Sequence, residues 1–554
     1  MAKNVLFIMC DQLRADYLGC TGHPHIRTPF IDALAKRGVL FRNAYAQSPI
    51  CGPSRMSAYT GRYVRSHGST QNGVPLRIGE PTLGDHLREI GVRSVLVGKT
   101  HMVADTAGMK RLGVDPESYE GVLASQCGFE PFERDDGLHP DGPYDPDPAY
   151  DAALRKAGFD SANPWEHFAN SGEAPDGALQ NGWLLTHADK PARVSDEMSE
   201  TPYMTRRAMD FIRTAKADGR PWCLHLSYIK PHWPYIAPAP WHALYGAKDV
   251  VPPVKTEAER TAPHPVFGAF MQERYSQCFA DDALREKVIP AYMGLVSQID
   301  ASLGELFAFL DEQGLSNETL IVFTSDHGDY LGDHWLGEKY LFHDPSVKVP
   351  LIVYDPSPAA DATRGTVRHE LVELIDLAPT FLEYFGGAPK PHVLEGRSLM
   401  PLLHDAGPRP WRTYAVSEYD YAPDIVRLRL GMPVRDCRLT MVTDNRLKYV
   451  RVEGFRPMIY DLAADPQELV DRGDHPDMVA RAAALAAALD AWAFDTHPRI
   501  TVSDAFFQAD DGTALIFDPN LAPGLLIGYR DEADLAAEIA KRDAWRAAQK
   551  ERSS

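Results

Sequence analysis

The sequence has few cysteines, and their spacing shows no pairing. Seven cysteines are scattered over 554 residues, an odd and sparse set that does not suit a disulfide framework. Long apolar runs are missing as well. No stretch approaches the length of a membrane-spanning helix, and the apolar run at residues 5–9 ends too soon for a secretion signal. We therefore expect a cytoplasmic protein without a membrane partner.

Basic residues are too few to balance the acidic ones. The 57 Lys and Arg residues face 77 Asp and Glu residues, which gives a formal net charge of -20. Because binding to nucleic acid requires a basic face, no nucleic-acid partner is expected, although a local basic pocket for a small anion is compatible with this balance. With 44% hydrophobic and 24% charged residues, the composition is that of a soluble globular protein.

Apolar runs typical of strands buried on both faces alternate with helical patterns. The expected strands cover residues 5–9, 39–45, 93–97, 222–227, 319–324 and 350–354, and the expected helices cover residues 29–37, 82–90, 203–214 and 295–310. This alternation predicts an α/β domain over residues 1–405, with a large, doubly wound, mostly parallel sheet flanked by helices. Residues 108–198 lack periodicity, and we expect them to form either a lid or a surface insertion.

The pattern changes near residue 405. Short strands expected at residues 438–443, 447–452 and 458–462 precede an alanine-rich helix at residues 477–492. They predict a smaller α+β subdomain over residues 406–498, built on an antiparallel sheet.

The remaining residues, 499–554, are expected to form a C-terminal arm. Its last helix carries Leu535, Ile539 and Trp545 on one side. A lone tail cannot bury such a stripe, so the arm either folds back or contacts a neighbouring subunit. The second arrangement would make the protein a homo-oligomer, a dimer or a tetramer.

One short stretch, residues 48–61, combines a cysteine with an anion-binding pattern. Cys51 stands at the expected start of a helix that Gly61 ends, and Arg55 follows one turn later. Free N–H groups and the helix dipole favour negative charge at that end, and the guanidinium fork adds to this. The stretch therefore suits an oxyanion held beside a nucleophile, but a buried cysteine at a helix start gives the same local pattern.

Polar side chains follow several predicted strands at the point where each strand ends. They are Asp11 and Gln12, Lys99 and His101, His232, and Asp326 and His327. Because sites in open α/β sheets lie at the carboxyl ends of the strands, we expect these side chains to meet there. Asp11, Asp326 and His327 offer oxygen ligands and one imidazole, which suit a divalent cation such as Mn²⁺ or Ca²⁺ better than Zn²⁺.

These motifs together resemble those of a known family. Cys51-Gly-Pro-Ser-Arg55, followed by Thr60-Gly61, resembles the sulfatase signature Cys-x-Pro-x-Arg, found in the alkaline phosphatase superfamily. Further motifs occur in the family's order: Asp11-Gln12, Gly98-Lys-Thr-His101, Pro231-His-Trp-Pro-Tyr235, Ser325-Asp-His-Gly328, Lys339, Leu377-Ala-Pro-Thr380 and residues 459–466. The resemblance covers most of the chain, and the number and order of the motifs make it specific.

The resemblance implies a modified residue at position 51. In the sulfatase family a formylglycine-generating enzyme oxidises the signature cysteine, so Cys51 is expected to become formylglycine with that enzyme as maturation partner. One hydroxyl of the formylglycine hydrate, bound to the metal, would attack sulfur to give a hemiacetal sulfate. Deprotonation of the second hydroxyl would then expel sulfate and restore the aldehyde.

The resemblance also assigns roles to the site residues. The metal ligands would be Asp11, Gln12, the oxygen at position 51, Asp326 and His327. Arg55 would steady the hydrate, and His101 would be the base of the elimination step. The substrate would be bound by Asn72, Lys99, His232 and Lys339, with His232 or a lysine as general acid.

Two motifs depart from the common sulfatase pattern. Asp11-Gln12 and Asp326-His327 stand where many sulfatases have Asp-Asp and Asp-Asn, and these pairs resemble phosphonate monoester hydrolases and choline-sulfatase-like members. Gln71-Asn72 and the C-terminal arm also resemble the phosphonate hydrolases, whose arms form tetramers. Lys99-Thr-His101, in contrast, follows the sulfatase pattern.

We therefore favour an arylsulfatase-like hydrolase acting on sulfate monoesters of small, aromatic alcohols. Hydrolysis of phosphonate monoesters or phosphodiesters at the same site is the alternative, and one enzyme could do both. Trp233 and Tyr235 could stack on the alcohol or only form a rigid packing loop. A non-catalytic sulfatase-like binding protein is a remote alternative, because the reactive side chains are retained.

Overall fold

The protein is described by a computed structural model that covers residues 4–140, 145, 147–405, 407–495, 497, 499–501, 503 and 529–552. The chain forms two compact units. The larger takes in Met1–Pro389 and Leu394–Thr496, and the smaller takes in Lys390–Val393 and His497–Ser554. The domain boundaries expected at residues 405 and 498 stay predictions, and much of the predicted arm lies outside the described residues.

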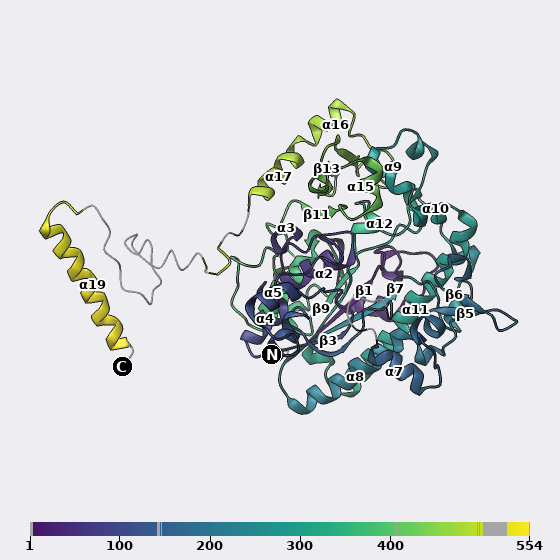
Figure 1. Cartoon of the computed structure of the whole chain (residues 1–554), viewed down its shortest axis with the longest axis horizontal. Coiled ribbons are helices and arrows are strands. Elements are labelled where there is room, and N and C mark those ends of the chain that lie inside the picture. Colours follow the sequence, from purple (N-terminus) through teal and green to yellow (C-terminus); the bar gives the residue numbers. More distant parts are fainter. Residues whose placement is uncertain are drawn as a thin grey trace. The chain divides into compact units, whose positions relative to one another are not determined.

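The larger unit contains an 8-stranded sheet with the strand order β10-β2-β9-β8-β1-β7-β3-β4 (Figure 1). Its strands are β1 (Asn4–Asp11), β2 (Val39–Tyr45), β3 (Arg93–Gly98), β4 (Glu130–Arg134), β7 (Trp222–Pro231), β8 (Thr319–Ser325), β9 (Leu351–Tyr354) and β10 (Thr366–Glu373). Neighbouring strands run parallel, except that β9 is antiparallel to both β2 and β8. The predicted large, mostly parallel sheet is confirmed. Two edge strands, β10 and β4, were not predicted, and β4 lies within the aperiodic residues 108–198.

Helices cover both faces of this sheet. The side chains of β1 alternate between two cores, and for example Ile8 belongs to one and Phe7 to the other. The first core is covered by α1 (Pro29–Arg37), α8 (Glu200–Asp218) and α11 (Asp282–Glu312), and the second by α2 (Cys51–Thr60), α4 (Leu83–Glu89), α13 (Leu377–Tyr384) and α14 (Met400–His404). The sheet is therefore doubly wound, and its central strands are largely apolar because both of their faces are buried.

The helix α11 is the one described helix that is long and apolar enough to cross a membrane, although no such stretch was expected from the sequence. Its apolar window is 78% buried inside the protein. Val296 and Leu303 of this helix are fully buried in the first core. We therefore assign α11 to the core of the fold.

A second sheet of four antiparallel strands confirms the predicted C-terminal α+β architecture. Its order is β11 (Ala415–Asp420), β12 (Arg438–Thr443), β13 (Leu447–Val452) and β14 (Met458–Asp461). The strand β11 was not predicted. The single helix expected at residues 477–492 is instead two helices, α16 (Pro476–Arg481) and α17 (Ala483–Phe494), which meet at Ala482.

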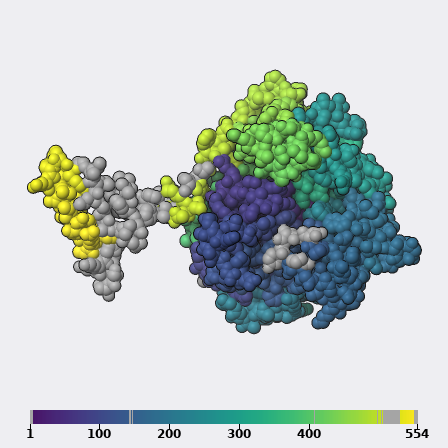
Figure 2. All heavy atoms as spheres, in the orientation of Figure 1, coloured from purple at the N-terminus to yellow at the C-terminus, as the bar shows by residue number. Residues whose placement is uncertain are grey.

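The small sheet is joined to the large one by hydrogen bonds and buried charges. The backbone N–H of Glu418 donates to the carbonyl of Gln47 over 2.8 Å, and Figure 2 shows the green C-terminal sheet against the purple N-terminal residues. The Lys448 side chain is fully buried. Its Nζ donates to the Phe342 carbonyl at 2.7 Å and pairs with Asp344 at 2.8 Å and Glu468 at 2.5 Å.

We expect Lys448→Met to lower the free energy of unfolding by about 3 kcal/mol, because it leaves the buried carboxylate of Glu468 without its cation and removes one of the two lysines that pair with the half-buried Asp344. Denaturation by urea measures this loss. Lys348→Met is the matched control, since Lys348 pairs with the same Asp344 at 2.9 Å but is 20% exposed. The control should cost less than about 1 kcal/mol. Equal losses for the two variants would contradict the role given to Lys448.

Candidate active site

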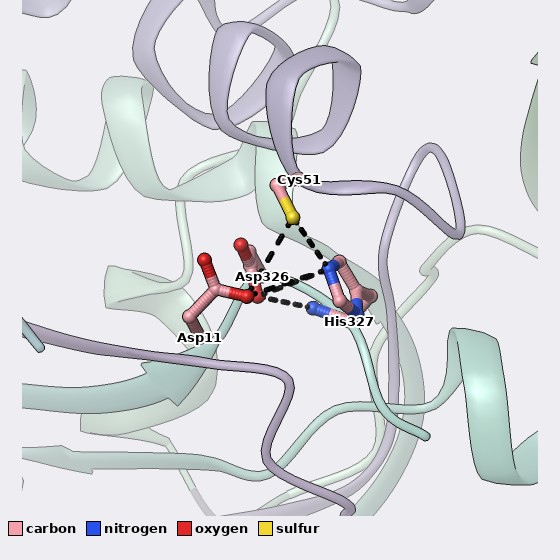
Figure 3. A group of neighbouring side chains, drawn as sticks. All are labelled: Asp11, Cys51, Asp326 and His327. Atoms are coloured by element: carbon pink, nitrogen blue, oxygen red, sulfur yellow. Dashed lines mark hydrogen bonds and ion pairs between the residues drawn. The ribbon is translucent and has the colours of Figure 1, made fainter. Parts of the chain in front are cut away.

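The carboxyl ends of β1, β2, β3, β7 and β8 face the same edge of the large sheet. Residues that directly follow or end these strands are Asp11, Lys99, His232 and Asp326, and Cys51 begins α2 just after β2. The ligand atoms of Asp11, Cys51, Asp326 and His327 lie within 4.8 Å of one another, and all four residues are buried. Figure 3 shows Cys51 pointing from its helix toward the other three. The structure thus brings together residues that are up to 316 positions apart, as expected from the strand ends.

The helix α2 presents its amino end to this cluster. It begins at Cys51 after an extended Ile50 and ends at Gly61, whose φ of 65° is left-handed, and all its residues are buried. The first-turn N–H of Gly52 donates to Oδ1 of Asn72 at 2.8 Å. Asn72 therefore supports the helix start, and the substrate contact expected of it stays a prediction.

Arg55 links the two carboxylates of the cluster. Its Nε donates to Asp326 Oδ2 at 2.7 Å, and its Nη2 lies 3.3 Å from Asp11 Oδ2. Nζ of Lys99 lies 2.6 Å from the same Asp11 oxygen. Burial by itself would raise the pKa of Asp11, but the charges of Lys99 and Arg55 hold that pKa below its usual range. Asp11 is therefore ionised, and its Oδ1 is directed at the cluster, 3.6 Å from Cys51 Sγ.

His327 has one ring nitrogen occupied and one directed into the cluster. Its Nδ1 lies 2.8 Å from the carbonyl oxygen of Gly328, so the proton sits on Nδ1 and donates there. Nε2 then lies 3.1 Å from Cys51 Sγ. Burial would lower the pKa of His327, but Asp326 and Cys51 raise it, so Nε2 can carry a proton in the metal-free site. Because the carbonyl occupies Nδ1, Nε2 is the nitrogen through which this histidine would bind a metal in place of that proton.

Gln12 adds an oxygen with a fixed orientation. Its Oε1 accepts from Lys339 Nζ at 2.9 Å, and its Nε2 donates to Asp329 Oδ2 at 2.6 Å and to the Tyr235 hydroxyl at 3.2 Å. Since an ammonium group can only donate, the amide cannot be turned the other way. Lys339 Nζ also lies 3.3 Å from Cys51 Sγ, so the amide oxygen is on the side of the cluster.

Together, these donors fit the divalent cation expected from the sequence. Carboxylate and amide oxygens with a single imidazole suit a hard cation such as Mn²⁺ or Ca²⁺, and the site lacks the thiolate-rich donors of structural zinc. The residues that could hold it are Asp11, Gln12, Asp326, His327 and the group at position 51.

Positive charge is concentrated on position 51 itself. Burial would raise the pKa of the Cys51 thiol, but Lys339, His327 and Lys99 together lower it well below its usual range. Any negatively charged atom placed at Sγ would gain the same stabilisation, in addition to that of the helix dipole.

The two other predicted histidines also lie beside Cys51. Burial lowers the pKa of His232 to about 4, against the attraction of Asp11. Its Nδ1 lies 2.7 Å from the Trp233 carbonyl and donates to it, so the neutral ring offers an acceptor on its other nitrogen. Burial would lower the pKa of Lys339, but the charges of Cys51 and Glu338 raise it. Of His232 and Lys339, Lys339 is therefore the protonated group. The general-acid role expected of His232 or a lysine therefore suits Lys339 better in this state.

His101 is held in a left-handed backbone conformation, with a φ of 54°. Its N–H and that of Thr100 both donate to Asp136 Oδ1, at 3.0 and 2.9 Å. Its side chain contacts Cys51, and its Nδ1 has no hydrogen-bond partner among the described residues.

Two residues of this site, Asp136 and Asp329, were missed by sequence reasoning. Asp136 follows β4, and because that strand was not predicted its end could not be placed at the sheet edge. Asp329 lies only three positions after Asp326 but resembles a turn residue. Tyr235 was considered as a stacking surface. It is instead 2% exposed, and its hydroxyl donates to Asp329 at 2.6 Å, so it takes the packing alternative.

We expect Asp329→Asn to weaken Mn²⁺ binding about tenfold, because second-layer partners that orient a ligand typically contribute that much to affinity. Calorimetric titration of Mn²⁺ into metal-free protein measures this without any turnover. Tyr235→Phe is the control, since it keeps the Asp329 carboxylate that orients Gln12 and removes only a hydroxyl, which lies 3.2 Å from Gln12 Nε2 and 2.6 Å from Asp329. It should have the smaller effect. An unchanged affinity in Asp329→Asn would show that Gln12 needs no orienting partner.

Comparisons with known proteins agree with this geometry. The sulfatase family model matches residues 3–388, and the model of the N-sulphoglucosamine sulphohydrolase C-terminal domain matches residues 332–493. The multifunctional alkaline phosphatase superfamily protein PehA of Trinickia caryophylli is 33% identical over 514 residues, 86% of this chain and 92% of that protein. An arylsulfatase of Clostridium perfringens is 28% identical over 440 residues, 76% of this chain and 83% of that protein.

A phosphonate monoester hydrolase from Silicibacter pomeroyi has a similar solved structure, with a TM-score of 0.78 at 28% identity. The alignment covers 90% of this chain and 97% of that one. With its fold, its buried metal-type cluster and the family match all in agreement, the chain belongs to the sulfatase family of the alkaline phosphatase superfamily.

Proposed function

We propose that the protein is a formylglycine-dependent metallohydrolase that cleaves singly charged esters, with sulfate monoesters of small aromatic alcohols as its preferred substrates. The observation that carries this proposal is the position of Cys51. Its Sγ lies 3.1 Å from His327 Nε2, 3.3 Å from Lys339 Nζ and 3.6 Å from Asp11 Oδ1. A nucleophile at residue 51 would thus contact the candidate metal ligands and also Lys339, which would bind the anionic group of the substrate.

The pairing of charges in the site favours a substrate with one negative charge. Lys99 is matched by Asp11 at 2.6 Å and Arg55 by Asp326 at 2.7 Å. Lys339 is 3.7 Å from the carboxylate of Glu338, and burial raises the pKa of Glu338 to about 7. Lys339 is therefore the lysine or arginine of the site least neutralised by protein, and we take it as the partner of a singly charged ester group, as in sulfate monoesters, phosphonate monoesters and phosphodiesters.

In this proposal Asp11, Gln12, Asp326 and His327 hold Mn²⁺ or Ca²⁺ with the oxygen at position 51. A formylglycine made from Cys51 by a formylglycine-generating enzyme would supply a hydrated aldehyde as nucleophile, and the cation would lower the pKa of its hydroxyl.

The chain's own residues then have separate tasks. Arg55 keeps the two carboxylates apart and aligned. Lys339 and Lys99 stabilise the charge that develops on the ester. His101, whose side chain contacts Cys51, accepts a proton from the group at position 51, and Lys339 donates one to the leaving oxygen.

Phosphonate monoester or phosphodiester hydrolysis is the second candidate. It is favoured by the similarity to the Silicibacter pomeroyi phosphonate monoester hydrolase over 97% of that chain. Gln12 and Asn72 belong to motifs that resemble those of the phosphonate monoester hydrolases. Gln12 contacts Lys339 in the site, and Asn72 contacts the first turn of α2. The same cations would stabilise a five-coordinate centre at sulfur or at phosphorus, so both activities are compatible with one site.

A panel of para-nitrophenyl esters tests the proposal. Protein produced together with a formylglycine-generating enzyme should cleave the sulfate, the phenylphosphonate and the diester, with kcat/KM about tenfold or more above that for the dianionic phosphate monoester. The proposed preference further expects the sulfate to be the best of the three. A larger kcat/KM for the phosphonate would establish the second candidate, and preference for the dianion would overturn both.

Cys51→Ala should lower every one of these activities by about a thousandfold or more, because it removes the covalent nucleophile. Cys278→Ala is the matched control, since that half-buried thiol is outside the cluster. Mass spectrometry of the peptide that carries residue 51 should show the aldehyde. An unmodified thiol in fully active protein would contradict the mechanism.

We further infer that the C-terminal arm joins copies of the chain. The helix α19 (Glu532–Arg552) carries half-buried Leu535, Ile539 and Trp545. Leu535→Glu with Ile539→Glu should reduce the molar mass measured by light scattering, whereas the exposed Ala537→Glu should not. Unchanged assembly in the double variant would show that this apolar side is not an interface.

A further inference from the structure

Trp183 is a solvent-exposed aromatic side chain close to the loop that carries His232. It is 43% exposed, and its ring centroid lies 5.5 Å from that of Trp233. The Trp233 ring is in turn 4.3 Å from the His232 ring, and His232 lies beside Cys51. A continuous row of rings therefore leads from the candidate nucleophile to the surface.

The turn that carries Trp183 is held rigidly. It follows the hairpin formed by β5 (Ser171–Glu173) and β6 (Leu179–Asn181). The N–H of Trp183 donates to Asn181 Oδ1 at 2.8 Å. A Cβ added to Gly182 would lie 1.9 Å from the Asn170 carbonyl oxygen and 2.9 Å from Ile236. The turn therefore packs closely against Asn170 and against Ile236, which follows the His232 loop, and only glycine fits at position 182.

A buried lysine fixes the His232 loop to the same segment. Nζ of Lys230 donates to Asn170 Oδ1 at 2.6 Å and to the Pro234 carbonyl at 3.0 Å, and it lies 3.4 Å from Glu200. Asn170 therefore contacts both the Trp183 turn and the His232 loop. Trp183 and Trp233 are held at a fixed separation, as a preformed binding surface requires.

The surroundings of Trp183 are apolar. Leu179 and Leu184, on either side of it in sequence, are 42% and 54% exposed. From the inner side, the fully buried Trp165 lies 6.1 Å from the Trp183 ring. Exposed apolar residues close to Trp183 in the sequence, together with its ring contacts to Trp165 and Trp233, give this turn the composition expected of a binding surface.

We propose that Trp183 and Trp233 form the subsite for the alcohol part of the ester, and that the substrates are esters of flat aromatic or other bulky apolar alcohols. This inference rests on the proposed function, because it places the anionic group of the ester at Cys51. We place the leaving group along the row of rings that begins at His232 beside Cys51, because that row continues through Trp233 and reaches the surface at Trp183. Tyr235, on the same loop, is buried and cannot serve.

Binding of sulfonates, which cannot be hydrolysed, tests the subsite directly. Trp183→Ala should weaken binding of naphthalene sulfonate about tenfold in calorimetry, equal to about 1.4 kcal/mol. Its effect on methane sulfonate should be less than about twofold. Trp183→Phe should retain most of the naphthalene sulfonate affinity. Tyr119→Ala, an exposed aromatic (57%) in α6 (Tyr119–Ala124), is the matched control and should change neither ligand.

Turnover separates this inference from the proposed function. In Trp183→Ala, the ratio of kcat/KM for an aryl sulfate to that for a small alkyl sulfate should fall about tenfold. The subsite would be overturned if Trp183→Ala weakened binding of both sulfonates equally, or of neither. It would also be overturned if the variant changed the molar mass of the protein but not its ligand binding. A wild-type protein that hydrolyses neither sulfates nor phosphonates, but binds naphthalene sulfonate through Trp183, would retain the subsite and reject the proposed function.

Discussion

Arg55 and the two carboxylates that it bridges, Asp11 and Asp326, are completely buried at the edge of the large sheet. An ion left unpaired at such depth costs several kcal/mol, so these three groups must stay together whenever the protein is folded. The sheet makes this possible because β1 and β8 are neighbours in register, with Cys10 opposite Ser325. That register places Asp11 next to Asp326, and α2 places Arg55 between them. Since Cys51 is one turn before Arg55, the position of the candidate nucleophile depends on the same ion network.

The neutral side chain at position 12 is explained by its neighbours. Gln12 lies between Lys339 on one side and the buried carboxylate of Asp329 on the other, at 2.9 and 2.6 Å. A carboxylate at position 12 would face Asp329 at hydrogen-bond distance, and two acids that close cannot both ionise. The amide avoids this conflict because it accepts from the lysine and donates to the acid. The departure from the Asp-Asp pattern of many sulfatases thus has a local cause, and it removes one negative charge from the site.

Sequence reasoning succeeded where the local pattern decides the structure. Residues 39–45 and 29–37 form β2 and α1 with those bounds, because a continuous apolar run and a proline-to-glycine helix pattern leave few alternatives. The sheet edge could then be predicted from the polar residues directly after each strand, which brought Asp11, Lys99, His232 and Asp326 together. Lys339 was different. Nothing in its surroundings marked it, and only the resemblance to sulfatases indicated it.

The features that were missed depend on tertiary contacts. The strands β4 and β10 lie at the two edges of the sheet, where partial exposure breaks the apolar pattern that identified the central strands. Asp136 could not be assigned without β4. Trp183 is also invisible to periodicity, since its importance comes from a turn fixed by Gly182 and Asn170.

Residues 108–198 therefore contribute to both the sheet and the site. They supply β4 to the sheet, Asp136 to the backbone of His101, and Trp183 to the row of rings that leads outward from His232. The strand ends provide the charged groups around position 51, and the buried ion network holds these groups in place. The exposed turn that carries Trp183 lies outside that network, so it can change without unpairing a buried charge. Under the proposed function, the alcohol subsite can thus vary among proteins with this fold while the groups around position 51 stay the same.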